Sequence, residues 1–390
     1  MTSPMVVLHI LAFVLGAAVV LLVLGSALKT VVLPQEGLTR LSQAVFAFVH
    51  RIMVRRWEDE TKPSTLRSLY APVALVSLPL VWMILIALAF WFVFWGTGSL
   101  DLQHAFEVSA SSLTTLGFSE PSSTARIVIA FIEATIGLGL VALLISYLPT
   151  IYGAYNGRER GINMLNPIAG IPPTVPGLIQ TLYRTGALDS QEFWRRQTDW
   201  IVDAEQTHVA FPILTYFPEA QGNLSWVASI GTVLDAAALL VSASEAQASP
   251  VLADETKGPL MTLVYGTAAI DRIARAANVP LPPAVKVVDI TSHRGDDPPP
   301  ISVTRQEYSA ALGSVAPVIG FETGREDEAW RRFAWIRSTY DRSLRSLAGI
   351  SHGAPAPWTT DRPAHVGRPR FLRTRSLPVD WSVRVRSTGG

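Results

Sequence analysis

The sequence predicts an all-α membrane protein with three transmembrane helices, a short re-entrant helix between the last two, and an α-helical cytoplasmic domain. Of its 390 residues, 49% are hydrophobic and 16% are charged, which is typical of a membrane protein with a water-soluble part. Three apolar runs, at 5–28, 71–95 and 127–152, are each long enough for a helix to cross the hydrocarbon core. Beyond about residue 155 the apolar residues recur at helical spacing, without an alternating strand pattern.

Changes in composition divide the chain into five segments. A first transmembrane helix (1–28) is followed by a basic, amphipathic cytoplasmic segment (29–70). A membrane module of outer helix, short helix, turn and inner helix comes next (71–154). An α-helical cytoplasmic domain (155–350) and a basic disordered tail (351–390) complete the chain.

The distribution of positive charge predicts the orientation in the plasma membrane. Lys and Arg gather in 29–67, whereas 96–125 contains neither, and Arg158 and Arg160 follow the third apolar run. Cytoplasmic loops carry the excess of Lys and Arg, so we expect the N-terminus outside and the C-terminus in the cytoplasm. The first run has no basic residue before it, which favours a retained span over a signal peptide.

The basic segment contains one amphipathic stripe, which predicts a helix. That helix would lie on the lipids of the inner membrane surface, or would pack on the soluble domain. The basic tail would touch anionic lipid headgroups or serve solubility alone. The apolar residues of the stripe are Leu38, Leu41, Val45, Phe48 and Ile52.

The most informative stretch is SASSLTTLGFSE, at 109–120. A short helix from Leu100 to about Ser112, with Ser99 as its cap, would lead into it. Gly117 permits the positive φ that aims successive carbonyl oxygens at one axis, and such carbonyls can replace the hydration shell of a cation. The Thr115 hydroxyl would add one more oxygen ligand for the cation at the inner end of this carbonyl line. The alternative is an ordinary extracellular turn between two anchors.

The stretch AFEVSASSLTTLGFSEP resembles the pore helix and filter of potassium channels, whose signature is TVGYG. The resemblance covers about 70–155. A serine at positive φ is strained by roughly 1–2 kcal/mol, so the outermost carbonyl site is expected to differ, which leaves strict potassium selectivity an open question. In the order of the signature, the implied filter residues are Thr115, Leu116, Gly117 and Phe118, with Ser119 in place of the second glycine.

The resemblance implies a subunit of a potassium-channel-like cation channel. Such a channel is a homotetramer that passes monovalent cations, above all potassium, without catalysis or a cofactor. Thr114 and Glu120 flank the filter and would support it. Glu133 lies inside the third run, where an ionisable residue indicates function, and it would bond the filter backbone or pore-helix serines 109, 111 and 112. The alternative is a carboxylate that snorkels outward.

Two glycines lie midway along the third run. Gly137 and Gly139 would form a hinge of the inner helix, as the resemblance implies, or close-packing sites between helices. Pro149 would set a bend at the inner mouth.

The cytoplasmic part is predicted as a Pro/Gly linker followed by helices. The stretch 225–243 is apolar enough for a fourth span, but its central Asp235 favours a buried helix of the soluble domain. The linker covers 166–177, and the helices cover about 189–208, 225–246 and 258–277, with a short one starting at Thr304 and Glu307 and a long one from Glu326 to Arg345.

Two other classes of function remain open. One is a membrane-anchored helical sensor or scaffold without conduction. The other is an enzyme or metal site around Asp203 and His208, although a polar helix face explains these residues more simply. The absence of cysteine excludes thiol chemistry and disulfides. Nothing in the sequence indicates a nucleic-acid partner.

Overall fold

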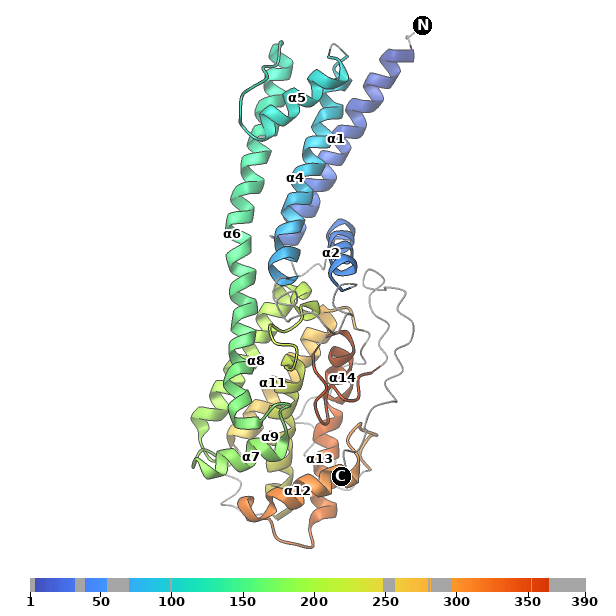
Figure 1. The fold of residues 1–390 in the computed structure, drawn as a ribbon. Coiled ribbons are helices and arrows are strands. Elements are labelled where there is room, and N and C mark those ends of the chain that lie inside the picture. The colour runs from blue at the N-terminus through green and yellow to red at the C-terminus, as the bar shows by residue number, and fades with distance from the viewer. Residues whose placement is uncertain are drawn as a thin grey trace, which may run out of the picture.

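The computed structural model describes residues 4–31, 39–54, 70–98, 100–247, 257–279, 281, 297–351 and 353–364. All regular structure in these ranges is helical. The upper half in Figure 1 contains α1 (Pro4–Val31), α2 (Arg40–Val54), α4 (Tyr70–Gly96), α5 (Leu102–Leu113) and the first part of α6 (Thr124–Ala169). The lower half contains α7 (Val175–Arg184), α8 (Gln191–Ala210), the 3₁₀ turn η2 (Pro212–Tyr216), α9 (Trp226–Gln247), α11 (Lys257–Ala276), α12 (Arg305–Ile319), α13 (Glu326–Ser338) and α14 (Asp341–Ile350).

Four helices of the described chain are long and apolar enough to cross a membrane, which is consistent with a membrane protein. Three of them, α1, α4 and α6, form the elongated upper part in Figure 1. The fourth, α9, lies among the helices of the lower part.

Helices α1 and α4 pack backbone against backbone. A Cβ added to Gly16 would stand 2.6 Å from the carbonyl oxygen of Ala89, and one added to Gly96 would stand 2.7 Å from that of His9. Small residues permit this approach where lipid leaves no hydrophobic drive between helices. The first span is therefore attached to the second along its length.

The amphipathic helix predicted in the basic segment is α2, and it packs on the membrane helices. Val45 and Val49 are buried, whereas Phe48 and Ile52 are exposed. The Ser42 hydroxyl is 2.9 Å from the Thr30 hydroxyl of α1, which ties α2 to the C-terminal end of that helix.

Helix α6 runs without interruption from the upper half into the lower domain. Its 46 residues span about 69 Å at 1.5 Å per residue, more than twice the hydrocarbon thickness. The boundary predicted at residue 155 therefore falls inside a helix. The predicted linker 166–177 is also wrong in part, because α6 continues to Ala169 and α7 begins at Val175.

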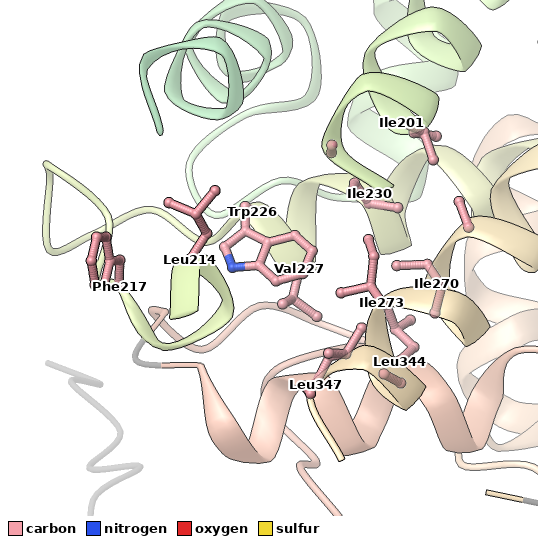
Figure 2. Packing of buried hydrophobic residues seen from close by; sticks show 14 of the residues in the cluster. Ile201, Leu214, Phe217, Trp226, Val227, Ile230, Ile270, Ile273, Leu344 and Leu347 are labelled. Carbon is pink, nitrogen blue, oxygen red and sulfur yellow. The ribbon is translucent and has the colours of Figure 1, made fainter. Parts of the chain in front are cut away.

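Helix α9 is the centre of the lower domain. All but one of its side chains up to Ala246 are buried, among neighbours from α7, α11, α13 and α14. Figure 2 shows Trp226, Val227 and Ile230 facing apolar residues of the surrounding helices. The placement agrees with the interpretation of 225–243 as a buried helix.

Two predicted helix starts can be compared with the structure. The capping box of Thr304 and Glu307 is confirmed, with both reciprocal hydrogen bonds present. Helix α5, the predicted pore helix, instead begins after Asp101, whose side chain accepts from the His104 amide at 3.1 Å. Ser99, the predicted cap, lies outside the described residues.

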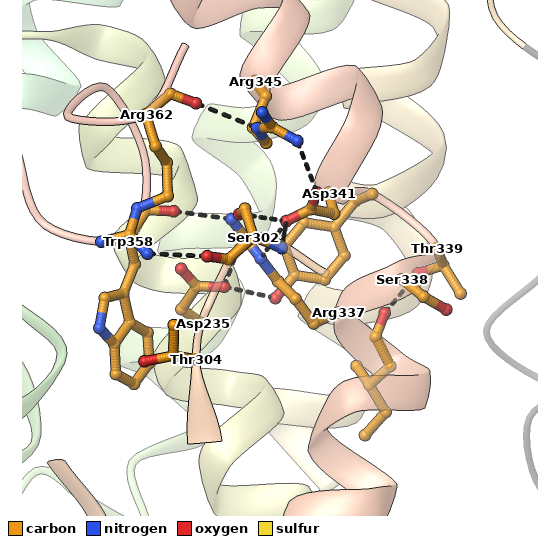
Figure 3. Close-up of polar contacts among 12 residues, drawn as sticks. Asp235, Ser302, Thr304, Arg337, Ser338, Thr339, Asp341, Arg345, Trp358 and Arg362 are labelled. Carbon is orange, nitrogen blue, oxygen red and sulfur yellow. Dashed lines mark hydrogen bonds and ion pairs between the residues drawn. The ribbon is translucent and has the colours of Figure 1, made fainter. Parts of the chain in front are cut away.

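The long helix predicted from Glu326 to Arg345 is wrong, because α13 ends at Ser338 and α14 starts at Asp341. Tyr340, at the break, donates its hydroxyl to buried Asp235 at 2.7 Å. Figure 3 shows this carboxylate and the Arg337 guanidinium that pairs with it at 2.8 Å.

The predicted disordered tail is wrong over its first part, because 353–364 packs on the domain. Arg337 donates to the carbonyl oxygen of Trp358 at 2.7 Å, and Arg362 pairs with Glu307 at 2.7 Å. Trp358 and Thr359 are buried. The remainder of the tail, 365–390, lies outside the described residues.

Candidate ion-conduction site

The candidate site is the turn between α5 and α6, and its lower end lies deep along α6. A Cβ added to Gly137 would stand 2.5 Å from the carbonyl oxygen of Leu113, the last residue of α5. Gly137 is roughly 20 Å along α6 from its first residue at 1.5 Å per residue. Figure 1 shows α5 lying obliquely beside α4 and α6, with the following residues returning to the upper end of α6.

The backbone of the turn has two left-handed residues. Gly117 has a φ of 69°, so the predicted positive φ is confirmed. The other is Thr115, with a φ of 55°, which the sequence did not indicate. Ser119, expected to carry the strain, is not among the residues with positive φ. Its amide instead donates to the Ser111 hydroxyl at 3.1 Å, which holds it against α5.

Amide groups of the turn point back to the end of α5. The Thr114, Thr115 and Leu116 amides donate to α5 carbonyls at 3.1–3.2 Å. No residue of the described chain donates a hydrogen bond to the carbonyl oxygens of 115–119. Residues 114–118 are exposed in the single chain, so the carbonyl oxygens of the turn are open to water or to a cation.

The side chains of the predicted filter point to several environments. Leu116 and Phe118 are 71% and 61% exposed in the single chain. The hydroxyls of Thr114 and Thr115 donate to the carbonyls of Ala110 and Thr114, at 2.6 and 2.7 Å. The Thr115 hydroxyl proton is therefore engaged within the turn, but its oxygen can still accept. Glu120, which follows the turn, is exposed.

Glu133 is fully buried where three helices meet. Its Oε1 is 2.6 Å from the Ser109 hydroxyl of α5, and the same hydroxyl is 3.0 Å from the Ala87 carbonyl of α4. The contact to a pore-helix serine is the one predicted, and support of the filter stays a prediction. Ser109 has one hydrogen for two acceptors, so a proton on Glu133 would complete both hydrogen bonds.

The two glycines of the predicted hinge have different surroundings. Gly137 is in close contact with Leu113, whereas a Cβ on Gly139 would meet nothing within 4 Å. Helix α6 is continuous through both. The structure thus contains the close-packing alternative at Gly137, and a hinge stays a prediction.

Asp203 and His208 do not form a metal site. They are five residues apart on α8, roughly 140° around the helix, so Asp203 is exposed while His208 is buried. His208 Nδ1 lies 2.7 Å from the Ala204 carbonyl, and burial lowers the pKa of the imidazole to about 3. The described residues contain no group of three His, Cys, Asp or Glu that could hold a metal ion.

Sequence reasoning missed one residue at this end of the molecule and gave another the wrong partner. Arg126 is buried and donates to the hydroxyls of Thr97 and Ser122 at 3.0 and 2.7 Å, which joins the C-terminal end of α4 to the N-terminal end of α6. Its signal was a single arginine at the start of an apolar run. Ser111 was predicted as a partner of Glu133, but it holds the Ser119 amide.

The chain matches no protein-family model, and no curated protein or solved structure matches it.

Proposed function

We propose that the protein is a subunit of a potassium-channel-like cation channel of the plasma membrane. Four chains surround one axis, each with its N-terminus outside and its C-terminus in the cytoplasm. Monovalent cations, potassium above all, pass down their gradient along the carbonyl oxygens of residues 115–119.

The observation that carries this proposal is the division of hydrogen bonds in the turn. Four of its amides donate to α5, while the carbonyls of 115–119 accept no hydrogen bond from the described chain. Water-mediated solvation would suffice for a surface turn. The α5 end lies roughly 20 Å along a helix apolar enough to span the membrane, however, and backbone at that depth is tolerated where it lines a water-filled path.

A second feature favours a cation over an anion at this place. The C-terminus of α5 directs its carbonyl ends and the negative end of its dipole to the same region. Arg126, the basic residue nearest to the turn in sequence, is directed to Thr97 and Ser122.

The test is cation flux into proteoliposomes, with potassium and sodium compared, for the wild type and Gly117→Ala. A Cβ at a φ of 69° costs roughly 1–2 kcal/mol in the left-handed region, so the carbonyl row should be distorted and flux abolished while the protein still folds. Gly320→Ala is the matched control, because Gly320 has a φ of 63° and equally open surroundings but caps α12. Equal flux in both variants would remove the filter assignment.

The oligomeric state separates the channel from the membrane-anchored sensor. A single turn provides one wall of a carbonyl cage, so native mass measurement in detergent should give a tetramer. A monomer that passes no ions would leave the helical domain, tethered by its spans, as the functional part.

A further inference from the structure

The cytoplasmic end of α6 is joined to the lower domain by a buried arginine. Arg158 donates through Nη1 to the carbonyls of Leu214 and Phe217 at 3.0 and 3.2 Å. Its Nη2 contacts the Glu159 carboxylate at 3.0 Å, and the Tyr155 hydroxyl donates to the Pro218 carbonyl at 3.2 Å. We call these α6 residues, together with 212–220, the α6 joint.

The α6 joint continues into the centre of the domain. Glu159 accepts from the Ala220 amide, and Glu219 accepts from the Trp226 amide at the start of α9, both at 3.1 Å. In the view of Figure 2, Leu214 lies between Phe217 and Trp226. Gly353 of the C-terminal segment covers Glu219, since a Cβ there would stand 3.1 Å from its Oε1. Hydrogen bonds thus connect α6 through the joint to the start of α9, and the C-terminal segment packs against it.

The α6 joint contains two carboxylates and one guanidinium away from water. Burial raises the pKa of Glu219 to about 7, against a lowering by Arg158, and Glu159 raises it further. His208, the titratable group of α8 near Arg158, stays neutral because its pKa is lowered to about 3. With Glu219 protonated, Arg158 and Glu159 balance each other. With Glu219 ionised, the joint carries one uncompensated negative charge.

We propose that the α6 joint is a pH-responsive coupling between the cytoplasmic domain and the ion-conducting helix, in which Glu219 gains and loses the proton. This inference rests on the channel function proposed above. The neutral joint holds α6 as seen here, and ionisation of Glu219 loosens its contacts because a second carboxylate competes for Arg158. Cytoplasmic acidification across the neutral range thus shifts α6 toward the observed position.

The experiment compares the wild type with Glu219→Gln, which imitates the protonated side chain. Flux into proteoliposomes is measured with the cytoplasmic-side pH varied from about 5 to about 8, on both sides of the expected midpoint. Wild-type flux should change with a midpoint near 7. Glu219→Gln should stay at the acidic wild-type value at every pH. Glu322→Gln, at an exposed carboxylate of the same domain, should behave as the wild type.

A second measurement reads the proton without conduction. The pKa of Glu219 is raised from 4.5 in the unfolded chain to about 7 in the folded state, so the folded state binds the proton of Glu219 more tightly. The wild-type Tm should therefore fall relative to that of Glu219→Gln as pH rises from 4.5 to about 7, and the difference should stay constant above that pH. As pH rises, the infrared band of protonated carboxyl groups should lose the contribution of Glu219, with a midpoint near pH 7. This loss should be found in the wild type and not in Glu219→Gln. Absence of both changes would overturn the assignment of the proton to Glu219.

The outcomes separate the two proposals. Wild-type flux that is flat with pH, or equal pH dependence in Glu219→Gln, would overturn the coupling and leave the channel in place. Wild-type proteoliposomes without flux at any pH would overturn the channel function, and the coupling with it, even if the infrared change is found.

Discussion

At the scale of single residues, the site depends on how buried polar atoms are shared. The Ser109 hydroxyl lies within hydrogen-bond distance of both Glu133 and the Ala87 carbonyl. A carbonyl can only accept, so the second hydrogen bond needs a hydrogen from Glu133. A neutral carboxyl is also the form that costs least inside a membrane. A protonated Glu133 would hold α4, α5 and α6 together as a hydrogen-bond donor to Ser109, which would then donate to Ala87.

This assignment predicts that Glu133→Gln conducts nearly as the wild type, because its amide can donate to Ser109. Glu133→Ala should lose flux and stability, by about 1–3 kcal/mol for polar groups left without a partner. Flux and thermal unfolding in detergent measure both effects. If the glutamine variant fails as badly as the alanine variant, a charge on Glu133 is what the filter needs.

The sequence predicted the positions of these residues better than their contacts. Gly117 and Glu133 were identified because a glycine in a polar turn and a carboxylate inside an apolar run are local signals. The left-handed Thr115 and the Ser111–Ser119 hydrogen bond depend on how the turn folds back on α5. No spacing in the sequence encodes that return.

At the scale of secondary-structure elements, α6 decides the architecture. It carries Glu133 and Gly137 against α5 and, about 30 Å further along at 1.5 Å per residue, Arg158 against the lower domain. A change of composition near residue 155 suggested a domain boundary, yet polar residues continue the same helix. A change from apolar to polar residues indicates that a helix passes into a different environment, and it does not indicate that the helix ends there.

The contact of α6 with α5 predicts opposite results at two neighbouring glycines. Gly137→Ala would place a Cβ 2.5 Å from the Leu113 carbonyl, so α5 must shift and flux should be lost, at a cost of about 1–3 kcal/mol for overpacking. Gly139→Ala meets nothing within 4 Å and should conduct normally. Flux and unfolding midpoints of the pair test this. Loss of flux in Gly139→Ala, without loss of stability, would instead support a hinge.

At the scale of the whole molecule, the helical class followed from sequence and the junctions between helices did not. Most helices of the lower domain begin within two residues of their predicted starts, because caps and apolar periodicity are local. The break between α13 and α14 and the ordered segment 353–364 are set by Asp235, roughly 100 residues away in the chain. Such partners are fixed by tertiary packing.

Asp235 is linked to the C-terminal segment through Arg337. The guanidinium of Arg337 pairs with Asp235 and also donates a hydrogen bond to the carbonyl oxygen of Trp358. Asp235→Ala would remove one of the two carboxylates that pair with the buried Arg337 guanidinium and would leave Asp341 at 3.2 Å. The unfolding free energy should fall by more than about 1 kcal/mol but by less than the ~3–5 kcal/mol of a fully broken buried pair, and amide exchange should rise first in 353–364. Arg195→Ala, at an exposed pair with Asp199, should cost less than about 1 kcal/mol. A cost at Asp235 no larger than this control would mean that apolar packing around α9, and not the buried pair, fixes the C-terminal segment.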